Sequence, residues 1–203
     1  MLQNTLLFGL GTCLLKGKSE ALNKYKVIEY NLTNFLDRKY YNTILDIGCG
    51  DGKYGSILKE YCNELIGIDI NINTSISNNL MYYYDKLIEV NILEYPEILK
   101  ELNYNLCVMT SFIEHIQKED GLNIIKNMSN SDIFISTPSK FSNSHTIFNI
   151  NNKPDLHKSL WNINDFYNLN FTNVYNVKVG ILHNIFYGNY VIALKNINME
   201  LYT

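Results

Sequence analysis

An apolar run that contains a carboxylate and leads directly into three alternating glycines spans residues 44–52. Glycine lets a backbone turn sharply and approach a ligand with no Cβ in the way. We expect a helix to begin near Asp51, and its free backbone amides would then point toward the same ligand. A second apolar strand at residues 65–68 ends in Asp69, whose carboxylate can accept both hydrogen bonds of a ribose diol. The two strand ends together predict a site for a nucleotide cofactor.

The position of the glycines relative to the strand distinguishes two kinds of cofactor site. Residues 50–55 match the Gly-x-Gly-x-x-Gly spacing of dinucleotide-binding folds, but in those folds the first glycine directly follows the strand. Here the strand meets Gly48 first, which gives Asp-x-Gly-x-Gly-x-Gly from Asp46. That pattern resembles motif I of the class I S-adenosylmethionine-dependent methyltransferases. The resemblance implies S-adenosylmethionine as cofactor, with the glycine loop against its methionine part, Asp69 on its ribose and Ile70 against its adenine ring.

Segments beyond the glycine loop resemble the same family. Residues 108–116 resemble its fourth strand, which runs into a Glu-His pair, and residues 132–138 resemble its fifth strand with a Thr-Pro exit. The third expected strand leads into Asn91, where many relatives have an acid that accepts a hydrogen bond from adenine; the amide oxygen of Asn91 can accept one too. The resemblance covers about residues 43–195. The cofactor-binding residues it implies are Asp46, Gly48, Cys49, Gly50, Gly52, Asp69, Ile70, Asn91, Ile92, Thr110 and Ser111.

Apolar segments alternate with helical patterns along the chain, which predicts a parallel sheet covered on both faces. The expected strands lie near residues 43–47, 64–69, 86–90, 104–109 and 131–136. The expected helices lie near residues 20–38, 52–62, 74–84, 94–102 and 119–129. Two more β-rich segments, 171–180 and 187–195, are close in sequence and predict an antiparallel hairpin. The expected fold class is α/β: a doubly wound, seven-stranded, mostly parallel sheet with a reversed C-terminal strand and helices on both faces.

The 203 residues, 46% of them apolar, suit a single domain with a proper core. We divide it into an N-terminal lead-in and helix (1–42), a cofactor-binding half (43–136), and an acceptor-side segment with the C-terminal hairpin (137–203). The net charge of -3 and the pI near 5.8 provide no general basic field. The composition therefore does not predict a nucleic-acid partner.

The apolar stretch at residues 6–15 lacks a basic leader region and is far shorter than a membrane span. We interpret it as a packed lead-in, which predicts no membrane association and a cytoplasmic protein. The four cysteines are scattered, with no Cys-x-x-Cys pair and no metal-finger spacing. We interpret Cys49 and Cys107 as small core residues.

The groups that act on a methyl acceptor must lie beyond the carboxyl ends of the strands, beside the cofactor. The candidate catalytic residues are Glu114 and His115 after the fourth strand and His157 after the fifth. His115 is a proton acceptor, a metal ligand or a residue that shapes its loop. His157 either lines the acceptor pocket or caps a helix that begins near Asn162. Glu114 either faces the site or anchors the local backbone.

Methyltransferases of the 3'-terminal ribose of small RNAs carry Glu-x-x-Glu-His after the fourth strand and a further histidine after the fifth, and they bind a divalent ion there. This chain resembles them at Glu114, His115 and His157, but Ser111 stands in place of the first glutamate. Loss of an anionic ligand weakens a hard-cation site. The sequence therefore assigns no metal site, and whether these three residues bind a metal stays open.

The sequence thus predicts an S-adenosylmethionine-dependent methyltransferase with an unidentified acceptor, most simply a small molecule. One alternative is a metal-assisted RNA 3'-terminal ribose 2'-O-methyltransferase. Another is a methyltransferase-like domain that binds cofactor or a partner without turnover. A nicotinamide-dependent oxidoreductase is opposed by the glycine register and by the C-terminal hairpin. The acceptor atom, the use of a general base and the oligomeric state are left undetermined.

Overall fold

The computed structural model describes residues 24–72, 82–128, 131–139, 157–182 and 185–195. The expected lead-in at residues 6–15 and most of the expected helix at residues 74–84 lie outside the described residues. Seven strands form one sheet in the order β3-β2-β1-β4-β5-β7-β6.

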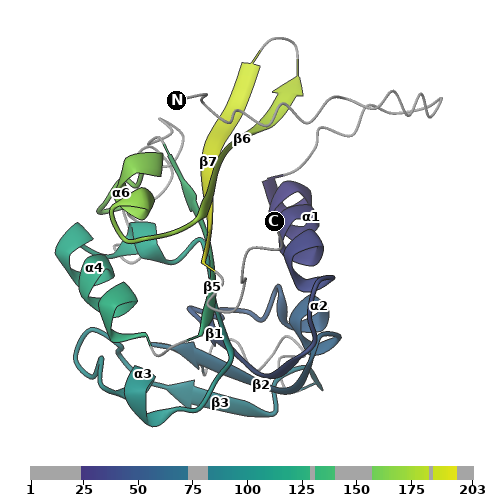
Figure 1. The fold of residues 1–203 in the computed structure, drawn as a ribbon, viewed down its shortest axis with the longest axis vertical. Helices are drawn as coiled ribbons and strands as arrows, with labels where there is room; N and C mark the ends of the chain where they lie inside the picture. Colours follow the sequence, from purple (N-terminus) through teal and green to yellow (C-terminus); the bar gives the residue numbers. More distant parts are fainter. Residues whose placement is uncertain (1–23, 73–81, 129–130, 140–156, 183–184, 196–203) are drawn as a thin grey trace, which may run out of the picture.

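The strands are β1 (Tyr41–Ile47), β2 (Cys62–Asp69), β3 (Lys86–Glu89), β4 (Leu106–Thr110), β5 (Asp132–Pro138), β6 (Asn173–Leu182) and β7 (Ile185–Lys195). The helices are α1 (Lys24–Leu36), α2 (Gly55–Lys59), α3 (Ile98–Glu101), the 3-10 helix η3 (Ile113–His115), α4 (Lys118–Asn127) and α6 (Ile163–Tyr167). Strands β1 to β5 run parallel, and β7 runs antiparallel to both β5 and β6. The predicted fold class is confirmed, including the reversed last strand (Figure 1).

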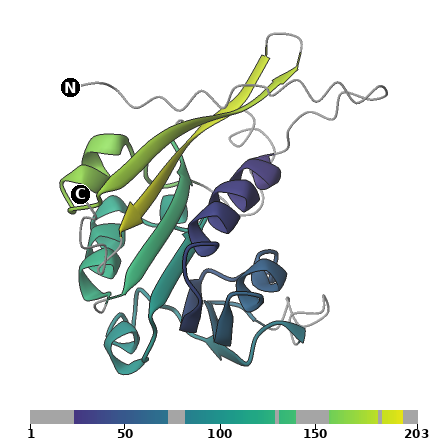
Figure 2. The same cartoon turned by 45° about the vertical axis from the view of Figure 1, so that its right-hand side comes forward.

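Successive side chains of the sheet point to opposite faces, and both faces are apolar. Leu45 and Ile47 of β1 pack in one core cluster with residues of α3, α4 and α6. Ile44 packs in a second cluster with residues of α1 and α2. Figures 1 and 2 show α1 and α2 on one side of the sheet and α3, α4 and α6 on the other. This two-sided burial explains why the central strands read as nearly continuous apolar runs.

Two expected helices are shorter than the sequence predicts. The helix expected at residues 52–62 is confined to α2, because Gly52 still has a left-handed backbone (φ 73°) and because Cys62 already pairs with Tyr41 in the sheet. The helix expected at residues 94–102 is confined to α3, because the chain first makes a turn. Both differences lengthen the loop between the end of a strand and the helix that follows it.

The parallel strands bring their carboxyl ends to a common edge. These ends are Ile47 of β1, Asp69 of β2, Thr110 of β4 and Pro138 of β5. In open sheets of this type ligands bind beyond such an edge. Among the described residues, no helix has the length and apolar character needed to cross a membrane.

Candidate active site

The glycine loop, residues 48–52, leaves β1 with a left-handed backbone at each of its glycines. The φ angles are 72° at Gly48, 53° at Gly50 and 73° at Gly52, values that residues with a Cβ rarely adopt. Within the described part of the chain and apart from its chain neighbours, a Cβ built on Gly50 would have only the Gly48 carbonyl oxygen within 4 Å, at 3.9 Å. The loop therefore presents open backbone at the edge of the sheet.

Asp69 links the end of β2 to the glycine loop. Its Oδ2 accepts a hydrogen bond from the Gly50 amide (2.9 Å), and its Oδ1 accepts one from the Asn71 amide (3.0 Å). Each carboxylate oxygen has capacity for a second hydrogen bond, so the carboxylate can still receive a ribose diol. The next residue, Ile70, is 66% exposed, which leaves an apolar surface beside that position.

Two of the predicted cofactor residues, Asp46 and Cys49, are buried below the loop. The Asp46 side chain accepts a hydrogen bond at Oδ2 from the Tyr84 hydroxyl (2.6 Å), and no described residue donates one to its Oδ1. Burial raises the pKa of the Asp46 carboxyl to about 7; the Tyr84 hydrogen bond opposes this rise and the charge of Asp69 adds to it. Burial also raises the pKa of the Cys49 thiol, which supports its interpretation as a core residue.

Asn91 and Ile92 follow β3 and belong to the predicted adenine side. Oδ1 of Asn91 accepts a hydrogen bond from the Leu93 amide (3.1 Å), and its Nδ2 donates one to Glu94 (2.7 Å). The Asn91 side chain therefore shapes a turn, and its oxygen retains one lone pair for a ligand. Ile92 is buried in the core.

Thr110 and Ser111 lie where β4 ends. Thr110 is buried, whereas Ser111 has a φ of 52°, a strained backbone for a residue with a Cβ. The Ser111 amide donates to the Ser136 carbonyl of β5 (2.9 Å), which holds this turn. The next side chain, Phe112, covers the glycine loop so closely that a Cβ on Gly48 would lie 2.5 Å from its ring. Sequence reasoning did not identify Phe112, because no local pattern predicts this contact.

The three candidate catalytic residues come together in space, and we call Glu114, His115 and His157 the His–Glu cluster. One ligand atom from each lies within 4.8 Å of the others. The two imidazole rings meet edge to face, with centroids 5.1 Å apart and an interplanar angle of 85°. The Glu114 carboxylate is buried and accepts a hydrogen bond at Oε2 from the Thr137 hydroxyl (3.0 Å).

A set of hydrogen bonds holds the chain before α6 against η3. The Glu114 carbonyl accepts from the amides of Lys158 (2.7 Å) and Ser159 (3.2 Å). The Ser159 hydroxyl donates to the Ile113 carbonyl (3.1 Å) and accepts from Nε1 of Trp161 (2.9 Å). The Glu114 carboxylate thus lies beside the two imidazoles, and the Glu114 carbonyl holds the neighbouring segment. Whether the carboxylate serves an acceptor site stays a prediction.

Asn162, and not His157, caps helix α6. The Asn162 side chain accepts hydrogen bonds from the amides of Asn164 and Asp165, and the Asp165 carboxylate accepts from the Asn162 amide. The helix begins where the sequence predicts, but the capping role considered for His157 is wrong. The capping box was visible in the sequence as an asparagine followed three residues later by an acid.

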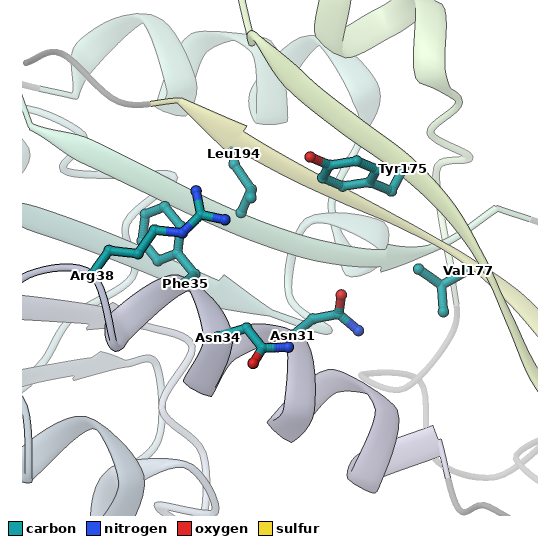
Figure 3. Close-up of a pocket in the computed structure, with 7 residues that line it drawn as sticks. All are labelled: Asn31, Asn34, Phe35, Arg38, Tyr175, Val177 and Leu194. Atoms are coloured by element: carbon teal, nitrogen blue, oxygen red, sulfur yellow. The ribbon is translucent and has the colours of Figure 1, made fainter. Parts of the chain in front are cut away.

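A separate hollow of about 140 Å³ lies between α1 and the β6–β7 hairpin. It is lined by Asn31, Asn34, Phe35, Arg38, Tyr175, Val177 and Leu194. Figure 3 shows these side chains coming from α1 and, for Arg38, from the chain just after it on one side, and from β6 and β7 on the other. None of the predicted site residues lines it, so it is not part of the candidate active site.

Solved structures match this chain, whereas no family model and no curated protein does. A SAM-dependent methyltransferase from Archaeoglobus fulgidus aligns with a TM-score of 0.58 and 21% identity, over 84% of this chain and 94% of that one. The N-methyltransferase NodS from Bradyrhizobium japonicum WM9, in complex with S-adenosyl-L-homocysteine, aligns with a TM-score of 0.58 and 11% identity, over 85% and 87%. The small RNA methyltransferase HEN1 aligns with a TM-score of 0.54 and 17% identity, over 84% and 25%. The chain therefore has the class I SAM-dependent methyltransferase fold.

Proposed function

We propose that this protein transfers a methyl group from S-adenosylmethionine to an acceptor bound beyond the carboxyl ends of β4 and β5. The observation that carries the proposal is the pairing of the glycine loop with Asp69, a carboxylate on the neighbouring strand that accepts a hydrogen bond from Gly50. The likeness of the fold to methyltransferases supports it. When bound, the cofactor supplies a methyl group that is already activated on a sulfonium.

The residues at the edge of the sheet suit this cofactor. The open face of Gly50 admits a ligand where a side chain would stand. Asp69 retains acceptor capacity for the ribose diol, and the exposed Ile70 offers an apolar surface to the adenine ring. Below the loop, the ionised form of Asp46 adds a negative charge that favours a cationic ligand.

The His–Glu cluster is assigned to the acceptor. Imidazole exchanges protons near neutral pH, so His115 or His157 serves as proton acceptor for a hydroxyl or amine. Glu114 lies beside both rings, where a carboxylate stabilises the imidazolium formed by such a transfer. The net charge of -3 gives no reason to expect a long polyanion, so we propose a small molecule as acceptor.

Calorimetric titration with S-adenosylmethionine and S-adenosylhomocysteine tests the cofactor site. We expect Asp69→Ala to lower both affinities by at least about tenfold, because the half-buried Gly50 amide loses its acceptor and the ribose loses its partner. Asp37→Ala is the matched control: this exposed carboxylate also accepts a hydrogen bond, from Tyr61 (2.6 Å), but lies before β1. No binding to the unaltered protein would overturn the proposal and favour a methyltransferase-like domain without turnover.

A second candidate is a metal-assisted methyltransferase acting on the 3'-terminal ribose of an RNA. The geometry of the His–Glu cluster favours it, since two imidazoles and a carboxylate suit a divalent ion and lie within 4.8 Å of one another. Metal bonds of roughly 2.1 Å at a tetrahedral angle place donor atoms about 3.4 Å apart, so donor atoms now up to 4.8 Å apart would need to approach by up to about 1.4 Å. The likeness to HEN1 adds to this candidate, and Ser111 in place of an acid counts against it.

Titration with Mn²⁺ distinguishes the two candidates. Binding that is lost in His157→Gln and retained in Lys158→Gln, its exposed neighbour, would favour the metal-assisted enzyme. An assay on RNA ending in a ribose and on the same RNA ending in a 2'-deoxyribose would then test the acceptor. Failure to bind Mn²⁺ would leave the small-molecule methyltransferase as the proposal.

A further inference from the structure

The Tyr84 side chain reaches under the glycine loop through a passage that two glycines leave open. A Cβ on Gly55, where α2 begins, would lie 2.6 Å from the Tyr84 ring, and one on Gly67 of β2 would lie 2.8 Å from it. Gly67 is also the residue of β2 that pairs with Asp46 of β1. Side chains at these two positions would block the ring, so the fold has left space for an aromatic residue to reach Asp46.

The next residue, Asp85, helps to hold Tyr84 in this position. The Asp85 amide donates to the Leu65 carbonyl (2.9 Å), and the Asp85 carboxylate accepts from the Leu65 amide (2.7 Å). These two bonds attach the chain at Asp85 to β2. The Tyr84 side chain is only 6% exposed, so its hydroxyl is directed by packing and not by solvent.

The Tyr84–Asp46 hydrogen bond stabilises the ionised and the protonated forms of the Asp46 carboxyl to different extents. A phenol that donates at 2.6 Å favours the ionised carboxylate over the acid. Burial and the charge of Asp46 raise the pKa of Tyr84, so the phenol stays protonated and remains a donor. Among the described residues, the other titratable groups that interact electrostatically with Asp46 are Asp69 from the end of β2, Cys49 from the loop and Cys107 from β4. Of these, Asp69 opposes ionisation.

We propose that Tyr84 is a positioning residue of the cofactor site: its hydroxyl holds Asp46 as a carboxylate below the glycine loop, and that charge favours a cationic ligand over a neutral one. This inference rests on the proposed function, because S-adenosylmethionine carries one more positive charge than S-adenosylhomocysteine. The ratio of the two affinities therefore reports the charge on Asp46.

The first test needs no cofactor. Aspartate labelled with carbon-13 at Cγ is followed by NMR between about pH 4 and pH 9, with the Asp46 signal assigned by its loss in Asp46→Asn. We expect its midpoint to rise by about one pH unit in Tyr84→Phe, which keeps the ring, and to stay in place in Tyr83→Phe. An unchanged midpoint in Tyr84→Phe would overturn the inference. If that variant does not fold, 3-fluorotyrosine at position 84, a stronger donor, should lower the midpoint.

The second test measures the affinities of both ligands as a function of pH. In the unaltered protein the preference for S-adenosylmethionine should increase with pH by a factor on the order of three to ten. The midpoint of that increase should move upward in Tyr84→Phe, and the increase should vanish in Asp46→Asn. A pH-independent preference alongside a normal Asp46 titration would overturn the cofactor part of the inference. No binding of either ligand would instead overturn the proposed function, and the NMR result would stand.

Discussion

The proposed cofactor side and the proposed acceptor side of the candidate site are assembled by different means. On the cofactor side, backbone groups make the contacts: the amides of Gly48 and Cys49 both donate to the Ile68 carbonyl, at 2.8 and 3.1 Å. On the acceptor side, side chains from distant segments make them, as where Trp161 donates to Ser159 and Ser159 to Ile113. The first side depends on backbone shape and the second on a buried aromatic anchor.

This difference predicts that the two sides can be damaged separately. The glycine loop follows from three alternating glycines and from the pairing of β1 with β2. The placement of His157 follows instead from Trp161, which is fully buried and packs directly against Gly121. A change at one set of residues should therefore leave the other side working.

The largest effect is expected from Trp161→Ala. Removal of a fully buried tryptophan should lower the free energy of unfolding by about 3–5 kcal/mol. Urea denaturation measures this loss. The Ser159 hydroxyl also loses a donor, so the segment that carries His157 should separate from η3.

Trp161→Phe is the control for this change, because it retains an aromatic ring and removes mainly the Nε1 hydrogen bond. Its cost should be smaller, about 1–3 kcal/mol. Its affinity for S-adenosylhomocysteine should match that of the unaltered protein. A loss of affinity for S-adenosylhomocysteine in Trp161→Phe would mean that the two sides are coupled, and it would contradict the comparison.

The cofactor side is tested by a matched pair, Gly48→Ala and Gly50→Ala. Both glycines have a positive φ, which costs about 1–2 kcal/mol with a Cβ. Only at Gly48 would the added methyl also meet the Phe112 ring, at 2.5 Å, so its total cost should reach about 2–4 kcal/mol. Thermal and urea denaturation measure the loss of stability in each variant and so show which of the two is larger. Equal costs for the two variants would mean that Phe112 moves aside freely.

The number and direction of the strands could be predicted from the sequence, because apolar runs and the closely spaced C-terminal segments report burial and hairpin formation locally; their order across the sheet could not. The lengths of two helices could not. Helix α2 is short because Tyr41 pairs with Cys62, a contact between strands that no pattern within residues 52–62 reveals. The pairing between strands therefore prevailed over the local helix pattern.

In the candidate site, too, residues in local sequence patterns could be predicted and residues placed by tertiary contacts could not. Asp46 and Asp69 could be found because they stand at strand ends next to a glycine pattern. Tyr84 could not, since its proposed role depends on the contacts of its ring with Gly55 and Gly67. For His157 the sequence left a helix cap and a site residue as alternatives; the structure places its ring against His115, and its catalytic role stays a prediction.

The third prediction concerns pH. The pKa of Asp46 is raised from its ordinary 3.8 to about 7 in the folded protein, so protonation favours the folded state. The stability from this group is present in full below about pH 4 and is lost as pH rises toward 7. Asp46→Asn removes that loss, and its stability relative to the unaltered protein should increase by about 1–3 kcal/mol from pH 4 to pH 8. Paired urea denaturation at several pH values measures it; a constant difference would contradict the burial argument.

The smallest effect is expected at Lys118, the surface counterpart of the Trp161 anchor. Its ammonium pairs with Asp165 (2.8 Å), donates to the Leu160 carbonyl (3.1 Å) and lies 5.3 Å from the centre of the Trp161 ring. Both charged side chains are partly exposed, so the pair is well solvated. Lys118→Met keeps the chain over the ring and should cost only about 0.5–1 kcal/mol, less at high salt. If its cost approached that of Trp161→Ala, surface charge and not burial would hold the acceptor side together.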